Sequence, residues 1–254
     1  MVTSAAPPQT APVEKPRRPR ARRALRRLGR ALAAVLLAFA VLLGIGWVLT
    51  PSVHDAQQRV SQELATNGAT ALQGAVPAKL ADALIATEDT RFEHHLGVDP
   101  IGAARAAWGA VTGTDQGGST LDQQLAKNLY AGGQQSFGDR IQSVVLALKL
   151  DATWSKDELL RMYLDDGYYG HGFYGLTSAS EGYFGRQPAD LTWAQATLLA
   201  GLFQAPSAYD PFVHPELAKH RQAHVLDRLV AVGTLSRPKA DQIAGQTWDL
   251  LPAA

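Results

Sequence analysis

Residues 117–128 read GGSTLDQQLAKN, and this stretch predicts a glycine turn that opens a helix with Ser119 or Thr120 as its N-cap. The free N–H groups and the positive dipole end of such a helix start attract anions. Thr120, Gln124 and Lys127 follow one another at i, i+4 and i+7, so they share one polar face. Hydroxyl, amide and ammonium groups on that face suit a substrate that carries phosphate. The plainer alternative is a capped helix whose polar side faces water.

A second stretch, EDTRFEHHLG at residues 88–97, offers a carboxylate for chemistry. Residues 78–88 have apolar positions at helical spacing, so Glu88 and Asp89 are expected to close a helix. Two adjacent carboxylates at a helix end point in different directions, so one can face a cleft while the other makes structural bonds. A glutamate in a partly desolvated cleft has a raised pKa and suits a general base. The competing interpretation is a solvated helix end.

The rest of this stretch predicts a fixed turn. Phe92 and His95 lie three residues apart and are expected to pack or hydrogen-bond, and Gly97 allows a backbone conformation closed to other residues. The sequence Glu93-His94-His95 does not have the HExxH spacing of a zinc site, and no third ligand is evident nearby. No metal site is therefore predicted at these histidines.

Charge is distributed very unevenly along the 254 residues, although the net charge is only +1. Residues 1–30 hold nine basic residues and one acidic residue, which gives +8, whereas the remainder holds 15 basic and 22 acidic residues, which gives −7. This distribution argues against a nucleic-acid-binding surface. There is no cysteine, so disulfides, thiolate metal sites and a cysteine nucleophile are excluded.

Residues 31–49 carry no charge and are long enough, at roughly 28 Å as a helix, to cross a bilayer core of about 30 Å. Trp47 lies near the far end, where interfacial aromatic residues are favoured. The preceding arginines predict a cytoplasmic N-terminus. The alternative is a cleaved signal peptide, but its apolar core is usually shorter, about 7–15 residues.

The domain organisation expected from these features has four parts. Residues 1–30 form a disordered, basic cytoplasmic tail, 31–50 a transmembrane helix, 51–75 a linker with a membrane-proximal helix, and 76–250 the main domain. Helices are predicted over 78–88, 141–153, 191–203, 214–231 and 236–247, together with one that follows a Ser155–Glu158 capping box. No alternating strand pattern is evident, so the fold class is mainly α. The aromatic and glycine-rich run 163–175 predicts a rigid loop that lines a groove or, alternatively, packs in the core.

Several blocks appear in order between about residues 76 and 232: EDxxFxxHxG, GGSTxxQQxxKN, SKDELLxxYL with GxGxYG after it, YFG, and LLAGLFQAPSAYDP. Together they resemble the peptidoglycan glycosyltransferases of glycosyltransferase family 51, the polymerising domains of class A penicillin-binding proteins and their monofunctional relatives. The resemblance implies a lysozyme-like, two-lobed, mainly helical domain preceded by a single transmembrane helix. Because no transpeptidase domain follows within the 254 residues, the monofunctional type is expected.

The implied reaction is the polymerisation of lipid II, with inversion at the anomeric carbon and release of polyprenyl pyrophosphate. By resemblance, Glu88 is the general base. Further positions match blocks that bind substrate: Asp89, Phe92, His95, Gly118, Ser119, Thr120, Gln123, Gln124, Lys127, Asn128, Arg140 and Arg221.

The resemblance also implies partners and a location. Lipid II, the growing glycan chain and membrane lipids are the expected partners, with wall-synthesis proteins as further candidates and no nucleic acid. No cofactor is required, although a divalent cation, Mg²⁺ or Mn²⁺, remains an open alternative at the pyrophosphate. The expected location is the plasma membrane, as a single-pass protein with the catalytic domain outside.

The chain departs from the family at the third block, RKxxE. Arg140 keeps one basic position, but Asp139 replaces another and Ser143 stands where the family has glutamate. This departure leaves open a second hypothesis, a non-catalytic member that binds lipid-linked glycan or scaffolds wall synthesis. A third hypothesis is a lytic muramidase, because that fold also uses a helix-borne glutamate.

Overall fold

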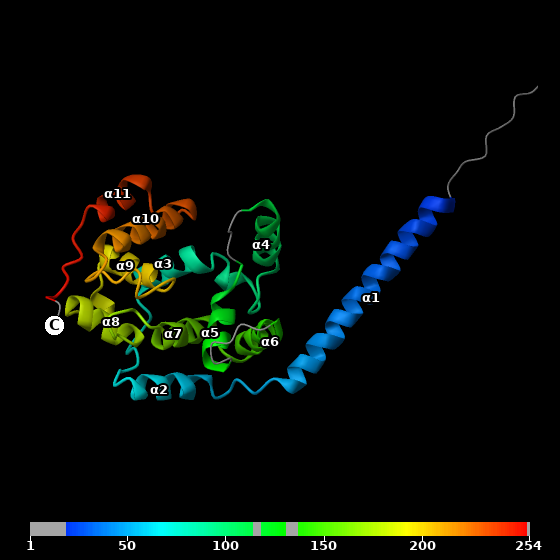
Figure 1. Ribbon diagram of the computed structural model, residues 1–254, viewed down its shortest axis with the longest axis horizontal. Helices are drawn as coiled ribbons and strands as arrows, with labels where there is room; N and C mark the ends of the chain where they lie inside the picture. Colours follow the sequence, from blue (N-terminus) through cyan, green and yellow to red (C-terminus); the bar gives the residue numbers. More distant parts are fainter. Residues whose placement is uncertain (1–18, 114–117, 131–136, 253–254) are drawn as a thin grey trace, which may run out of the picture. The chain divides into compact units, whose positions relative to one another are not determined.

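The computed structural model describes residues 19–113, 118–130 and 137–252 (Figure 1). The chain divides into two units, Met1–Ile45 and Gly46–Ala254. Helix α1 covers Pro19–Leu49, and its segment Ala24–Leu49 is long and apolar enough to cross a membrane. Residues 19–30, expected to belong to a disordered tail, are therefore helical. Proline at the first helical position and a run of alanine, leucine and arginine, all strong helix formers, explain the earlier start.

Most helices of the main domain begin and end close to their predicted limits. The Ser155 hydroxyl and the Glu158 side chain form the predicted capping box. The corresponding helices are α3 (Ala78–Glu88), α5 (Leu121–Tyr130), α7 (Lys156–Asp166), α9 (Trp193–Leu202), α10 (Pro215–Ala231) and α11 (Arg237–Ala244), with α2 (Ala56–Thr66) in the predicted linker.

Two elements differ from expectation. Helix α4 (Pro100–Thr112) was not predicted, because it is rich in alanine and glycine and gives a weak periodic signal. Its start is nevertheless encoded locally, since the Asp99 carboxylate accepts a hydrogen bond from the Ile101 amide and Pro100 occupies the first helical position. Helix α6 (Phe137–Thr153) begins four residues before its predicted start.

The helices of the second unit pack in two groups that meet at the end of α3 (Figure 1). In the first group α3, α9 and α10 pack on one another, and α11 covers α10. In the second group α5 packs on α6 and α7, while α2 and α8 (Gly175–Phe184) pack on α7. Helix α9 lies at the centre of the first group, and residues 194–202 are all buried.

The aromatic run is part of the core. Its first four residues belong to α7, and the loop that follows contains a single antiparallel bridge between Tyr168 and Tyr174; among the described residues there is no β-strand. Tyr169 and Tyr183 have no exposed surface. The core alternative is therefore correct for Tyr169, and Tyr183 of α8 packs in the same core, so both rings stabilise the second group of helices. Short 3₁₀ helices, η1 (Phe92–His94) and η2 (Pro188–Asp190), complete the described elements.

Candidate active site

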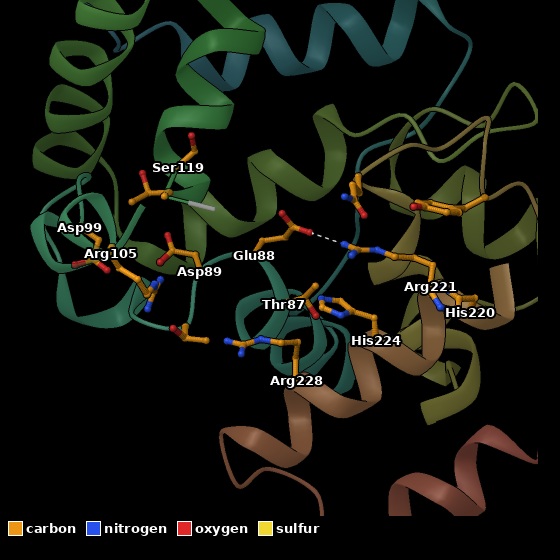
Figure 2. A pocket seen from close by; sticks show the side chains of 16 residues that line it. Thr87, Glu88, Asp89, Asp99, Arg105, Ser119, His220, Arg221, His224 and Arg228 are labelled. Carbon is orange, nitrogen blue, oxygen red and sulfur yellow. Dashed lines mark hydrogen bonds and ion pairs between the residues drawn. The ribbon is translucent and has the colours of Figure 1, made fainter. Parts of the chain in front are cut away.

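A pocket of about 640 Å³ opens where the end of α3 meets the start of α5 and one face of α10 (Figure 2). Figure 2 shows Glu88 between the Ser119 side and the side chains of α10. Charged and polar groups dominate the lining, which consists of Thr87, Glu88, Asp89, Thr90, Asp99, Gly102, Arg105, Gly118, Ser119, Thr120, Gln204, Tyr209, His220, Arg221, His224 and Arg228. The predicted base and the predicted helix start thus lie in one pocket.

Glu88 is the last residue of α3, and its side chain is only 19% exposed. Burial raises the pKa of the Glu88 carboxyl above its ordinary value, although the Arg221 charge and a hydrogen bond from Gln124 act in the opposite direction. The Arg221 Nη2 atom donates to Glu88 Oε1 at 3.0 Å. The site therefore holds an oriented carboxylate whose proton affinity suits general base chemistry.

Arg221, predicted to bind substrate, contacts Glu88 directly. Its Nε atom donates to the Gly201 carbonyl at 3.1 Å, which ties the guanidinium to the end of α9. Only 10% of its side chain is exposed. Arg221 therefore orients Glu88 from the α10 side, and its charge favours the ionised carboxylate.

Asp89 has a structural role, although it stands next to the base. Its Oδ2 atom accepts hydrogen bonds from His95 Nε2 at 2.8 Å and from the Leu121 amide at 3.0 Å. The Phe92 ring meets the His95 ring edge to face, with 6.2 Å between centroids, so the predicted packing of these two residues is confirmed. Neither ring lines the pocket, and both are buried. Together these residues fix the turn after α3 to the start of α5.

Thr120 is the N-cap of α5. The backbone amides at this helix start, which were predicted to bind an anion, donate to side chains of the protein instead. The Thr120 amide donates to Gln123 Oε1 at 3.0 Å and the Gln123 amide donates to Thr120 Oγ1 at 3.1 Å, a reciprocal capping box. The Thr120 hydroxyl donates to the Gly97 carbonyl at 2.7 Å. The next amide, that of Leu121, donates to the Asp89 carboxylate, so the helix start already binds an anionic group of the protein. Ser119, which is exposed and lines the pocket, remains available to a ligand.

The predicted polar face of α5 separates into different environments. Gln124 accepts a hydrogen bond from the Tyr163 hydroxyl at 2.8 Å and donates toward Glu88. The Asn128 amide donates to Asp166 Oδ2 at 2.8 Å. Lys127 is exposed and does not line the pocket. Among the described side chains of this face beyond the cap, Gln124 is the one that acts on Glu88.

The structure describes only part of the third block, where the chain departs from the family pattern. The side chain of Arg140 lies outside the described residues, as do Gly117 and the side chain of Asp139. Ser143 lies on α6 and is half-buried. Substrate binding by Arg140 therefore stays a prediction.

A profile of the transglycosylase family, described as Transglycosylase, matches residues 57–230. The chain belongs to this family. Penicillin-binding protein 1A of Neisseria flavescens is 45% identical over 168 residues, which cover 65% of this chain and 21% of that protein. Penicillin-binding protein 1F of Bacillus subtilis is 38% identical over 177 residues, which cover 69% of this chain and 25% of that protein.

The crystal structure of penicillin-binding protein 1A from Haemophilus influenzae is also similar, with a TM-score of 0.40 and 19% identity over 69% of this chain and 17% of that chain. The match to these relatives thus spans about a sixth to a quarter of their length.

The transglycosylase pocket contains cationic groups that the sequence prediction missed. His224 and Arg228 follow Arg221 at i+3 and i+7 on α10, so helical periodicity could have identified them. Burial and the charges of Arg221 and Arg228 lower the pKa of His224, which favours its neutral form. Arg105 comes from α4, the helix that was not predicted. The positive charges of Arg105 and Arg228 suit the pocket to an anionic ligand.

The carboxylates of the transglycosylase pocket do not fit a divalent cation. Each already has a partner, in the pairs Glu88–Arg221, Asp89–His95 and Asp99–Arg91. A metal ion would have to displace these partners, and the arginines of the same pocket would repel it.

A buried group that includes the lining residue Asp89, together with His95 and Asp122, has ligand atoms within 4.8 Å of one another. Lys156 Nζ lies 3.5 Å from Asp122 Oδ2, and His95 hydrogen-bonds Asp89. Because Lys156 already supplies a positive charge, this donor set fits a divalent ion poorly as well.

Proposed function

We propose that this transglycosylase polymerises lipid II into glycan strands and that Glu88 is the general base. Family membership supports a glycosyltransfer reaction on peptidoglycan precursors. The single observation that supports the base assignment best is the half-buried Glu88 carboxylate, oriented by Arg221 inside a pocket rich in cations.

The proposed step is a single displacement with inversion. Glu88 accepts the proton of the acceptor sugar hydroxyl, whose oxygen forms a bond to the anomeric carbon of the donor. The bond from that carbon to the pyrophosphate oxygen breaks, and polyprenyl pyrophosphate leaves with the electron pair. The raised pKa of Glu88 supports this role, because a carboxylate with higher proton affinity removes a hydroxyl proton more effectively.

Two arginines of the pocket support the assignment of the donor. Arg105 and Arg228 line the pocket that contains Glu88, and charge of this kind stabilises a leaving group on which negative charge develops. Arg228 Nε donates to the Ala86 carbonyl at 3.1 Å, so its position is set by the last turn of α3. A neutral glycan, as a muramidase would cleave, offers no group that uses these charges.

Turnover of labelled lipid II by the purified full-length protein in detergent tests the proposal. We expect the wild-type protein to form glycan chains and Glu88→Gln to lose about 10²–10⁴-fold in rate, because the amide cannot accept the proton. The matched control is Glu93→Gln, an exposed residue of η1 outside the pocket, which should retain wild-type turnover.

The other outcomes point to the competing functions. Binding of lipid II without chain growth by the wild-type protein would support a scaffold. The serine at position 143, where the family has glutamate, is the reason to consider that function. Release of soluble fragments from isolated cell wall would support a lytic enzyme. Undiminished polymerisation by Glu88→Gln would reject Glu88 as the base.

We also propose that α1 anchors the protein in the plasma membrane, with the N-terminus in the cytoplasm and residues 51–254 outside. The length and composition of Ala24–Leu49 support the anchor, and the arginines that precede its most apolar part support the orientation. An anchor of this kind would keep the pocket close to substrates that carry lipid tails.

A further inference from the structure

A chain of hydrogen bonds leads from α7 through α5 to the base. The Tyr163 hydroxyl, on the last turn of α7, donates to Gln124 Oε1 at 2.8 Å. Gln124 in turn lies within hydrogen-bonding reach of the Glu88 carboxyl and lowers its pKa. Tyr163 is 4% exposed and does not line the pocket, so its hydroxyl reaches the pocket by hydrogen bonding through Gln124.

The chemistry of the two end groups fixes the orientation of the amide between them. A carboxylate only accepts hydrogen bonds, so it requires the Nε2 end of Gln124. Burial first, and then the charge of Glu88, raise the pKa of the Tyr163 phenol, so it keeps its proton and can donate to the Oε1 end. Reversing the amide would place its oxygen against the Glu88 carboxylate. Both neighbours therefore select the same orientation.

The phenol itself is held firmly. The Tyr163 ring stacks on the Phe203 ring, with centroids 4.9 Å apart and 21° between the planes. Gly167 leaves the space that Phe203 occupies, since a Cβ there would lie 2.7 Å from the Phe203 ring. Because the ring is packed and α5 is capped at Thr120, the distance between the phenol and Gln124 is set by the fold.

Glu88 is thus oriented by groups of two different elements. Arg221 of α10 donates to Glu88 Oε1 at 3.0 Å, and Gln124 of α5 lies within hydrogen-bonding reach of the same carboxyl. The remaining charged or titratable groups that act on Glu88 or line its pocket are Asp89, Asp99, Arg105, Tyr209, His220, His224 and Arg228. None of these replaces the donor that Gln124 supplies.

We propose that Tyr163 is a positioning residue for the transfer reaction: its hydroxyl fixes the Gln124 amide so that Nε2 donates to the Glu88 carboxylate. The catalytic meaning of this inference rests on the proposed function of Glu88. The orientation itself does not, and it can be measured without turnover.

The variant Tyr163→Phe removes one oxygen atom and keeps the ring that stacks on Phe203. We expect the turnover number for lipid II to fall about 3–10-fold, the range that corresponds to one hydrogen bond, with little change in KM. Because the Gln124 hydrogen bond lowers the pKa of Glu88, its loss should raise that pKa. The acidic limb of the pH–rate profile should therefore move to higher pH.

The matched control is Tyr169→Phe. The Tyr169 hydroxyl is also buried, donates to the Leu164 carbonyl at 3.0 Å, and its ring packs on the same Phe203 with 4.9 Å between centroids. This variant should lose stability without moving the pH–rate profile. An equal shift in both variants would show a general packing effect and overturn the inference.

Two further measurements separate this inference from the proposed function. In a Gln124→Ala background, Tyr163→Phe should cause no further loss of turnover, because the hydroxyl acts only through the amide. Independent losses that add would overturn the inference. ¹³C NMR titration of Glu88, assigned with Glu88→Gln, reports its pKa even in a protein that does not polymerise lipid II. An unchanged Glu88 pKa in Tyr163→Phe would reject the role of the phenol, whatever the activity.

Discussion

At the scale of single residues, neighbours in the sequence have different tasks. Glu88 leaves 19% of its side chain exposed in the pocket, whereas Asp89 leaves 4% and is bonded to His95 and the start of α5. Asp122 is a third case, because its carboxyl is buried and no hydrogen-bond partner is found among the described residues. Burial raises the pKa of Asp122 to about 6, despite the attraction of Lys156.

The Asp122 carboxyl should make the domain more stable in mild acid. Between its ordinary pKa of 3.8 and about 6, the folded protein binds this proton and the unfolded chain does not, so stability falls as pH rises through that window. The full effect is at most about 3 kcal/mol, at 1.36 kcal/mol per pKa unit. We expect Asp122→Asn to reduce the decline in melting temperature between pH 4 and 7.

The melting temperature in detergent, measured at several pH values, checks this expectation. Asp157→Asn, which changes an exposed carboxyl of the neighbouring helix α7, is the matched control and should follow the wild-type curve. Parallel curves for Asp122→Asn and the wild-type protein would show that Asp122 does not titrate in this window.

At the scale of elements, the pocket depends on how the segment after α3 packs against α5 and α6. Gly97 adopts φ 81°, and its carbonyl accepts the Thr120 hydroxyl of the α5 cap. A Cβ at Gly97 would lie 2.3 Å from the Ala147 carbonyl oxygen of α6. The position thus requires glycine for two reasons, its backbone conformation and the close approach of α6.

The variant Gly97→Ala should destabilise the domain by at least about 3 kcal/mol, because it adds a clash with backbone atoms to the strain of a positive φ. Gly113→Ala is the matched control. Gly113 also has a positive φ, 74°, but a Cβ there meets nothing within 4 Å, so about 1–2 kcal/mol is expected. Urea unfolding in detergent measures both, and equal losses would mean that the contact with α6 does not limit this position.

At the scale of the whole molecule, the chain combines a candidate membrane span with a compact helical domain. The span Ala24–Leu49 measures roughly 39 Å as a helix, which exceeds a bilayer core of about 30 Å. Arginines are concentrated at and before its start. By the positive-inside rule, we therefore propose that the transglycosylase domain lies outside the cytoplasm.

The absence of cysteine allows a direct test of this topology. We expect Ser236→Cys, an exposed position between α10 and α11, to react with a membrane-impermeant maleimide in intact cells. Ser4→Cys, before α1, should react only after the membrane is permeabilised. Labelling in the opposite order would reverse the proposed orientation, and loss of the N-terminal label would indicate a cleaved signal peptide.

Local chemistry determined which helices form and which residues could act. Periodic apolar positions were sufficient for α3, α7 and α10, and the Ser155–Glu158 capping box was correct because it depends only on residues three apart. The sequence also contained the family blocks that identified Glu88 as the base candidate. Helix α4 was missed because its alanines and glycines give little periodic signal.

Only the tertiary structure decided which partners those residues have and how deeply they are buried. The anion site expected at the start of α5 is occupied by the Asp89 carboxylate, which comes from 32 residues earlier in the chain. Arg221, 133 residues after Glu88, donates a hydrogen bond to the Glu88 carboxylate. Such pairings cross between helices that meet through packing, and burial then sets which carboxyls keep their protons. Neither the partner of a side chain nor its burial is encoded in local spacing.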